Sequence, residues 1–465
     1  MESEGIASPS RLHTMPFIVL GVSIASVLAA MAISLLQLPL AMIVSAVIAV
    51  PLVILLFRHP TVTYVLFVFA GQIKAIPWFE HLPDLTLSFA AIVGTLVIVR
   101  AFQSRNKFRV PFEGILLFAL AVLMVVGLIY TPAFAAGLEK TLRFLVLSLL
   151  AGVAPFVLFR DKESLRSVFV MLWILAVIGS IHGLIHFDDP LSERVQVLSA
   201  GQTSTGRMMA LGTFSAIFVF MQSPARLRRL LGFLSLPLFV GALIGAGSRG
   251  PFYSVIVTLL LAGLLALIRR QARLHSVLAA MLGVVAFGRW ILHQYGQARP
   301  VERLLSFLYA IRAGTIIARP RLEMFEYALR LFFQHPVLGV GVAGYSLVWG
   351  GSIFTYPHNA FLEVASELGL FGLIIFAALI ITTYKKVMQL LFEGTAVESR
   401  ELPLALFCGL VFSTLGAMVS GSLNSHRDLW MFIGLVSVSF EILVGPAARL
   451  DTSPARSNGG ERARA

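Results

Sequence analysis

The chain has 465 residues, of which 58% are apolar and only 13% charged, and its mean hydropathy is +0.89. A water-soluble domain carries about 25% charged residues, so the composition excludes a soluble protein and favours a membrane protein. The formal net charge of +13 is also found in nucleic-acid-binding proteins. In membrane proteins, however, lysine and arginine accumulate in cytoplasmic loops, and we therefore expect the lipid bilayer, and no nucleic acid, as a partner.

Apolar runs long enough to cross a bilayer recur along the whole sequence. A hydrocarbon layer of about 30 Å requires about 20 apolar residues in a helix. By this measure the sequence predicts about fourteen spans, at residues 15–36, 38–57, 60–79, 84–100, 112–130, 139–159, 167–187, 207–222, 231–247, 251–268, 274–293, 359–383, 402–420 and 427–446. The third is interrupted by Pro77 and the eighth is short. The predicted fold class is an all-α, polytopic transmembrane helical bundle of about 12–14 spans.

Basic residues fall in alternate connections, and this alternation predicts the orientation of the bundle. The basic group at 160–166 and the next one at 226–229 are separated by two predicted spans. Placing all such groups in the cytoplasm puts both termini there as well. We therefore expect a cytoplasmic N-terminus at 1–14, an uncleaved N-terminal bundle at 15–293, a large external loop at 294–357, C-terminal spans at 358–446 and a disordered cytoplasmic tail at 447–465.

The large external loop contains a segment with helical periodicity. Within residues 321–335 the apolar side chains that share one face are Leu322, Phe325, Ala328, Leu329 and Phe332. An amphipathic helix of this kind either packs on the bundle as a lid or lies in the membrane interface. Both placements are compatible with covering a site.

Ionisable side chains at external helix ends are the candidates for chemistry, because burying charge in an apolar bundle is costly. Arg249 lies in Gly245-Ala-Gly-Ser-Arg-Gly-Pro251, a turn that joins two spans with almost no loop. One interpretation is an arginine that extends from a helix end toward water. The other is a phosphate-binding residue, because a guanidinium offers paired donors to phosphate oxygens.

A second candidate, His358, lies where the large loop re-enters the membrane. Pro357 and Asn359 predict a helix start at this point. His358 is either a structural residue at that helix start or a base, since histidine exchanges protons near neutral pH. Glu367 lies about two turns further into the membrane and needs a partner there. We expect it to orient His358 or to pair with an arginine.

Three segments together resemble the C-terminal signature of the O-antigen ligase and polymerase superfamily. They are His335-Pro-Val-Leu-Gly-Val-Gly341, Pro357-His-Asn-Ala-Phe-Leu362 and Glu367-Leu-Gly-Leu-Phe-Gly372. The tripeptide Ser248-Arg249-Gly250 and the long external loop match further elements of that family in position. The resemblance covers residues 245–380, and the combination is more specific than the tripeptide alone.

The resemblance implies a metal-independent, inverting glycosyltransferase of the GT-C type that needs no cofactor. It would lie in the cytoplasmic (inner) membrane with its active site on the periplasmic side. Its donor would be a glycan on undecaprenyl diphosphate, and its acceptor a hydroxyl of a glycan or of lipid A core. Partners in polysaccharide export or chain-length control are compatible with this reading.

The resemblance also implies roles for individual residues. By position, His358 would be the base that activates the acceptor hydroxyl, with Asn359 and Glu367 in support. The lipid diphosphate would be bound by Arg249, which is also assigned as catalytic, by Arg321, and by an arginine of an earlier external loop, for which Arg194 and Arg207 both fit.

Several alternatives stay open. Polymerisation of O-antigen or exopolysaccharide repeat units is preferred over ligation to lipid A core, and a protein O-oligosaccharyltransferase is a third choice of acceptor. A flippase for lipid-linked oligosaccharides would suit fourteen spans, but related halves and charges near the midplane would be expected of it. A metal-dependent oligosaccharyltransferase could use Asp188 and Asp189, although a turn before Pro190 explains them better.

Overall fold

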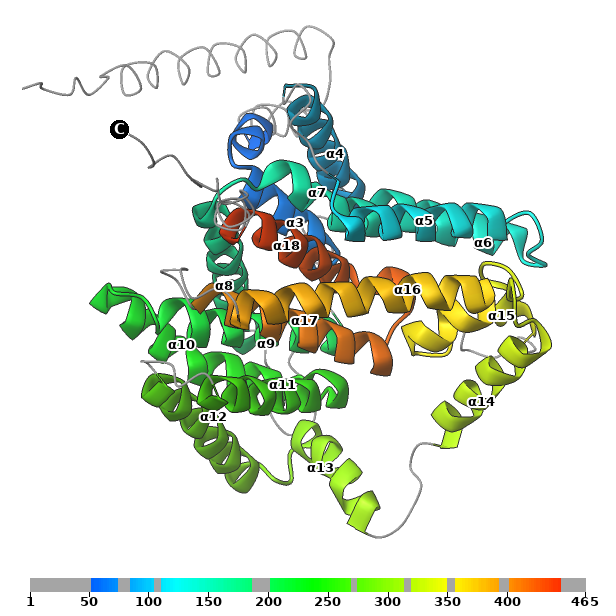
Figure 1. The fold of residues 1–465 in the computed structure, drawn as a ribbon. Coiled ribbons are helices and arrows are strands. Elements are labelled where there is room, and N and C mark those ends of the chain that lie inside the picture. The colour runs from blue at the N-terminus through cyan, green and yellow to red at the C-terminus, as the bar shows by residue number, and fades with distance from the viewer. Residues whose placement is uncertain are drawn as a thin grey trace, which may run out of the picture. The chain divides into compact units, whose positions relative to one another are not determined.

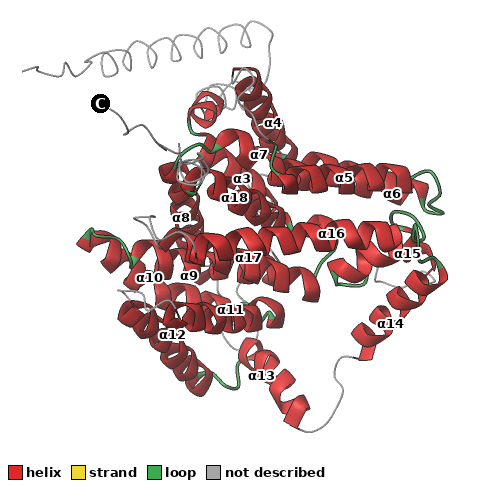
Figure 2. Cartoon of the chain, viewed as in Figure 1, coloured by secondary structure: helices red, strands yellow, loops and turns green. Residues whose placement is uncertain are grey.

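The computed structural model describes residues 52–73, 84–103, 110–185, 201–268, 274–312, 319–348, 356–392 and 401–444. Across these residues the secondary structure is helical and no strand is formed (Figures 1 and 2). The predicted all-α fold class is therefore confirmed. The chain divides into two units, Met1–Thr63 and Tyr64–Ala465. The second unit contains all of the predicted site residues.

Seven helices of the described residues are long and apolar enough to cross a membrane. They are α4 (Leu85–Gln103), the continuous helix Phe134–Leu158, α8 (Lys162–Ile185), α10 (Arg226–Gly245), α11 (Arg249–Ile268), α16 (Ala360–Phe392) and α17 (Glu401–Val419). The helix Phe134–Leu158 comprises α6 (Phe134–Arg143), a π-helical segment (Phe144–Leu149) and α7 (Leu150–Leu158). Counting Leu52–Arg58 with α3 (Pro60–Ile73) as one span raises the number to eight. Such helices are those of a multi-pass membrane protein.

The remaining predicted spans correspond to helices that this criterion does not include. They are α5 (Phe112–Gly127), α9 (Gln202–Ser215) with a π-helical end (Ala216–Phe220), α12 (Leu274–Gln294) and α18 (Arg427–Leu443). Each span predicted from residue 60 onward thus coincides with a helix. The span predicted at 15–36, most of that at 38–57, and both predicted cytoplasmic ends lie outside the described residues. The choice between twelve and fourteen spans therefore stays a prediction.

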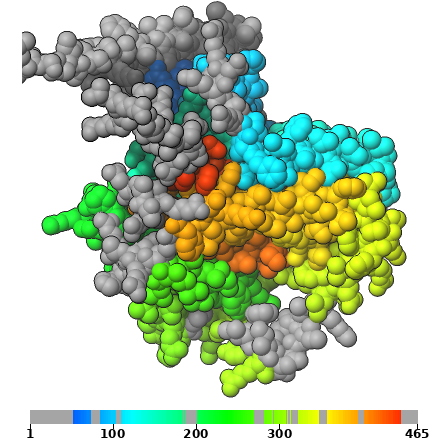
Figure 3. Space-filling model, viewed as in Figure 1, coloured from blue at the N-terminus to red at the C-terminus, as the bar shows by residue number. Residues whose placement is uncertain are grey.

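The predicted external loop contains α13 (Arg299–Arg312), α14 (Arg319–Gln334) and a short α15 (Gly344–Val348). The amphipathic helix predicted at 321–335 is α14, which lies against α16 (Figure 3). Its buried face carries Met324, Ala328 and Leu331. Leu322 and Leu329, which the sequence predicts on the same face as Ala328, are exposed.

The most deeply buried span of the described residues is α17, in which 83% of the apolar window is buried. It packs against α11, α16 and α18. Aromatic rings fill the space between neighbouring helices: Phe412 meets Phe214 at a ring-centroid distance of 5.6 Å, and Trp430 meets Phe144 at 5.3 Å. The edge-on geometry of both pairs is the favoured one. The connection that leaves α17 is thereby held at a defined place.

The long helix α16 is broken at Gly369, where the loop that precedes α15 crosses it. Gly369 has φ +64° and ψ −157°, a conformation that is essentially restricted to glycine. Opposite it, Gly339 has φ +71°, and a Cβ there would lie 2.4 Å from the carbonyl carbon of Glu367. Two glycines therefore allow the loop and the helix to meet backbone to backbone.

Hydrogen bonds join the loop to the carbonyl groups that the break exposes. The N–H groups of Val340 and Gly341 donate to the carbonyl oxygens of Ser366 and Glu367 at 2.9 and 3.0 Å. On the other side of the loop, the hydroxyl of Thr131 donates to the carbonyl of Val342 at 2.7 Å. Two of the three signature segments, 335–341 and 367–372, thus form one interlocked structural unit.

Candidate functional site

His358 is held in an unusual backbone conformation immediately before α16. Its φ is +55°, which is uncommon for a residue other than glycine. Next to it, the side-chain oxygen of Asn359 accepts the N–H groups of Phe361 and Leu362 at 3.0 and 3.1 Å. Asn359 is therefore the N-cap of α16, and the predicted helix start is confirmed. The ring of Tyr356 meets the imidazole edge-on at 4.6 Å.

The imidazole of His358 contacts the connection between α17 and α18, residues 420–426, which we call the 420–426 loop. The N–H of Gly421 donates to Nδ1 of His358 at 3.3 Å. Because Nδ1 accepts this hydrogen bond, the neutral ring carries its proton on Nε2. Gly421 has φ +76°, a conformation that suits glycine. Nothing in the sequence pattern pointed to this loop.

One arginine, Arg321, lies within electrostatic range of His358, and a second, Arg249, lies within range of Arg321. The pKa of His358 is lowered from its ordinary value by burial of the ring and by the positive charge of Arg321. The pKa of Arg321, on α14, is also lowered, first by partial burial of its own side chain and then by the positive charge of Arg249. These electrostatic interactions thus run from Arg249 through Arg321 to His358, residues that are up to 109 positions apart in the chain. A neutral His358 is the form that accepts a proton.

Arg249 is the first residue of α11, directly after the turn that follows α10. This turn includes Gly247, whose φ is +59°, and the predicted tight connection is therefore confirmed. The Nε of Arg249 donates to the carbonyl oxygen of Arg303 on α13 at 3.0 Å. Among the described residues, this is the hydrogen bond that the guanidinium makes, and it leaves both Nη groups for an anion.

Arg207, on α9, holds the 420–426 loop from its other end. Its Nη1 donates to the carbonyl of Ser425 at 3.0 Å, and its Nη2 to the hydroxyl of Ser420 at 3.1 Å. The carboxylate of Asp428 lies 3.9 Å from Nη1. The pKa of Tyr356 is raised, mainly by burial of the side chain. The positive charge of Arg207, which lies within electrostatic range, partly offsets this rise. The other candidate, Arg194, lies outside the described residues.

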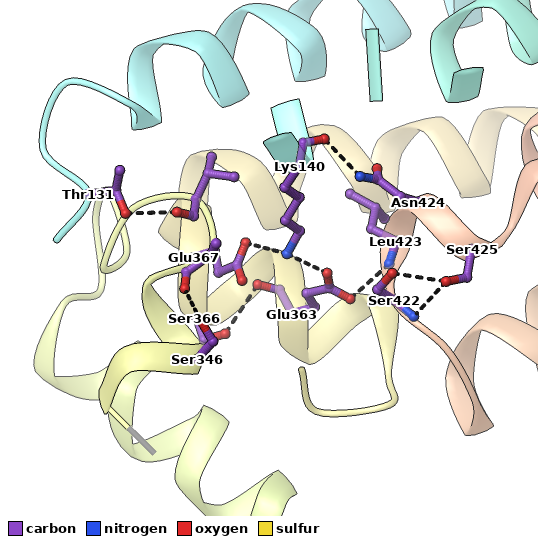
Figure 4. A network of polar contacts seen from close by, with 12 residues as sticks. Thr131, Lys140, Ser346, Glu363, Ser366, Glu367, Ser422, Leu423, Asn424 and Ser425 are labelled. Atoms are coloured by element: carbon purple, nitrogen blue, oxygen red, sulfur yellow. Dashed lines mark hydrogen bonds and ion pairs between the residues drawn. The ribbon is translucent and has the colours of Figure 1, made fainter. Parts of the chain in front are cut away.

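Glu367 belongs to a buried ionic cluster that sequence reasoning missed. The Nζ of Lys140 on α6 lies 2.5 Å from Oε1 of Glu363 and 2.7 Å from Oε2 of Glu367 (Figure 4). The expected pairing of Glu367 with an arginine was wrong, because Lys140 takes that place. A lysine at the start of an apolar span was the available signal, since such residues usually have a partner inside the bundle.

The charges gathered at this end of the helices suit an anion. Arg249 and Arg321 repel each other until a negative charge lies between them. Among the described residues, no three His, Cys, Asp or Glu side chains gather as they would around a metal ion. The acidic pair Asp188 and Asp189 lies outside the described residues.

Comparison with known proteins gives one family. Residues 234–377 match the family model described as O-antigen ligase, whereas no match was found among curated proteins. The matched stretch runs from α10 into α16 and includes Arg249, Arg321 and His358. Lys140 and the 420–426 loop lie outside it. The match is to this part of the chain, and it supports the resemblance to the O-antigen ligase and polymerase superfamily predicted from the signature segments.

Proposed function

We propose that the protein transfers a glycan from undecaprenyl diphosphate to an acceptor hydroxyl on the outer face of the cytoplasmic membrane. The observation that carries this proposal is that Arg321 lies within electrostatic range of both Arg249 and His358. These residues would supply the two functions that the reaction needs, an anion site for the leaving group and a base for the acceptor.

The two arginines would bind the diphosphate. A guanidinium donates two parallel hydrogen bonds to phosphate oxygens, and the Nη groups of Arg249 are suited to this. When the bond between the anomeric carbon and the diphosphate breaks, negative charge grows on the leaving oxygen. Fixed positive charges at that oxygen stabilise the transition state more than the ground state. No nucleotide is required, because the lipid diphosphate is already an activated leaving group.

His358 would take the proton of the acceptor hydroxyl. The hydroxyl oxygen forms the new bond to the anomeric carbon, the electron pair of the old bond leaves with the diphosphate, and the proton passes to Nδ1. In this step the acceptor hydroxyl takes the place of the N–H of Gly421, which donates to Nδ1 at 3.3 Å in the free protein. A single displacement of this kind inverts the anomeric centre.

Binding of the donor would also prepare the base. In the free protein the charge of Arg321 lowers the pKa of His358. A bound diphosphate offsets that charge and raises the pKa again. His358 would therefore be neutral before the donor arrives and more basic once it is in place.

The proposal is tested with the purified full-length chain, reconstituted in lipid with undecaprenyl-diphosphate-linked repeat units. We expect a ladder of lengthening products if the protein is a polymerase, which is our first hypothesis. A single shift of added lipid A core would identify a ligase, and labelling of an added protein acceptor would identify protein glycosylation. Movement of the donor across the bilayer without any new glycosidic bond would contradict the proposal and favour a flippase.

A further inference from the structure

The 420–426 loop is attached to the bundle at points that converge on the candidate site. The N–H of Leu423 donates to Oε2 of Glu363 at 2.9 Å, and the side-chain amide of Asn424 donates to the carbonyl of Lys140 at 2.7 Å (Figure 4). From the same loop, the N–H of Gly421 reaches His358. The loop therefore connects the buried ionic cluster to the imidazole.

Glu363 has one oxygen for each of two tasks. Its Oε1 faces Lys140 at 2.5 Å and its Oε2 accepts the N–H of Leu423. The Glu363 side chain is 1% exposed, and that of Lys140 is 13% exposed. Lys140 holds the carboxylate in one orientation, because a buried ion pair with short contacts has little freedom to rotate. Glu367, bound to the same ammonium, fixes Lys140 from the other side.

This anchor is two residues from the contact with His358. With Leu423 fixed, the position of Gly421 depends on few backbone torsions, and Gly421 already has the left-handed φ of +76°. A Cβ on Gly421 would lie 3.1 Å from Nε2 of His426, so the loop fits closely between its neighbours. The loop N–H is thus presented to the imidazole at a defined place.

We propose that Glu363, oriented by Lys140, is a positioning residue that anchors the 420–426 loop and thereby holds the N–H of Gly421 on Nδ1 of His358. Before the acceptor binds, the contact sets the tautomer and the orientation of the imidazole. When the acceptor hydroxyl takes the place of the N–H of Gly421, the Nδ1 lone pair of His358 already points toward it. The effect on catalysis rests on the proposed function. The assignment of the Nε2–H tautomer to His358 is independent of that function.

The first test compares variants of Glu363 in the transfer assay. We expect Glu363→Ala to lower kcat on the order of 10- to 100-fold, as small misplacements of a reacting group do, with the KM for the donor unchanged. Glu363→Gln keeps an oxygen for the N–H of Leu423 and leaves Lys140 paired with Glu367, so it should restore most of kcat. Asn424→Ala loosens the loop without touching the ion pair and should lower kcat in the same way, by less.

A matched control separates positioning from general stability. Lys386, also on α16, pairs with Glu113 of α5 at 2.5 Å, and the Glu113 side chain is likewise 1% exposed. Glu113→Ala therefore removes an equally buried carboxylate far from His358 in the chain, and it should lower thermal stability while leaving kcat unchanged. A double-mutant cycle completes the test: in a His358→Ala background, Glu363→Ala should have no further effect on the residual rate. Additive effects, or a Gln variant as impaired as the Ala variant, would overturn the proposal.

The second test does not depend on activity. The chain labelled with ¹⁵N-histidine in lipid nanodiscs should show His358 as the Nε2–H tautomer at a pH above the histidine range, with the signal assigned by its loss in His358→Gln. In Glu363→Ala the signal should move toward a mixture of tautomers, and in Glu113→Ala it should not move. An unchanged tautomer in Glu363→Ala refutes the anchor. If the wild-type chain transfers no glycan, the proposed function fails, and this measurement still decides the inference.

Discussion

Gly339 and Gly369 meet where the loop between α14 and α15 crosses the long helix α16. A Cβ on Gly369 would lie 2.6 Å from the nitrogen of Gly339 and 2.4 Å from the carbonyl oxygen of Val337. Both glycines have positive φ angles. The crossing joins the loop that follows α14 to α16, and α14 itself packs against α16. Arg321 on α14 and His358 directly before α16 thus lie on the two elements that this contact joins.

Gly369→Ala is expected to destabilise the protein strongly. The side chain adds backbone strain of about 1–3 kcal/mol at this φ and ψ, and it meets fixed backbone atoms that cannot move away. The thermal unfolding midpoint of the detergent-solubilised chain should fall by several degrees. Gly94→Ala in α4 is the control, because a Cβ there meets nothing within 4 Å. Equal midpoints for the two variants would contradict the interlocked crossing.

The pH dependence of transfer follows from the lowered pKa of His358. A base must be deprotonated, so the rate rises with pH through its pKa. Burial and Arg321 lower this pKa in the free protein, which places the acid limb of kcat/KM below the ordinary histidine value. Bound diphosphate raises the pKa, so the acid limb of kcat should lie at higher pH than that of kcat/KM.

The same argument predicts the effect of removing the charge. Arg321→Gln should move the acid limb of kcat/KM to higher pH, because His358 loses a positive neighbour. Arg330→Gln, on the same helix, should leave the acid limb in place. A limb that stays at the same pH in Arg321→Gln would show that the two residues are not coupled.

The helices and their order could be predicted from the sequence because each span needs its own apolar run, and a run of that length is a local property. The turn at Arg249 and the N-cap at Asn359 were predictable for the same reason, since glycine, proline and asparagine act on the adjoining backbone. Each of these features is decided by residues that are neighbours in the chain.

The contacts of the site could not be predicted, because they join distant positions. Lys140 is 227 residues from Glu367, and a charged residue needs a partner without specifying which one. The same limit explains the wrong assignment of a partner to Glu367. The 420–426 loop contains serine, glycine and asparagine, which are typical of any turn, so its contact with His358 left no signal in its composition.

Arg249→Lys is expected to weaken donor binding more than loss of charge alone would explain. Lysine keeps the positive charge but cannot present two parallel donors to phosphate oxygens. The KM for the lipid-linked donor should rise on the order of 10-fold, while the pH profile stays near that of the wild type. Arg330→Lys is the control for an exposed arginine of the same region. An unchanged KM in Arg249→Lys would place the diphosphate elsewhere.

Chelation of divalent cations is expected to leave transfer unchanged. In the proposed mechanism the charge of the leaving diphosphate is offset by arginine side chains, and no step uses a metal ion. The rate should therefore be equal before and after treatment of the reconstituted protein with EDTA. Loss of activity that returns on addition of Mg²⁺ or Mn²⁺ would favour the metal-dependent alternative.

Arg207 and Arg249 are expected to differ in the kinetic constant that they affect. The Nη groups of Arg207 donate to the carbonyl of Ser425 and the hydroxyl of Ser420, whereas Arg249 keeps its Nη groups for an anion. Arg207→Lys should therefore loosen the 420–426 loop and lower kcat without raising the KM for the donor. If Arg207→Lys instead raises this KM as Arg249→Lys does, Arg207 leaves the loop when the donor binds. Its second role would then be the phosphate contact predicted from the sequence.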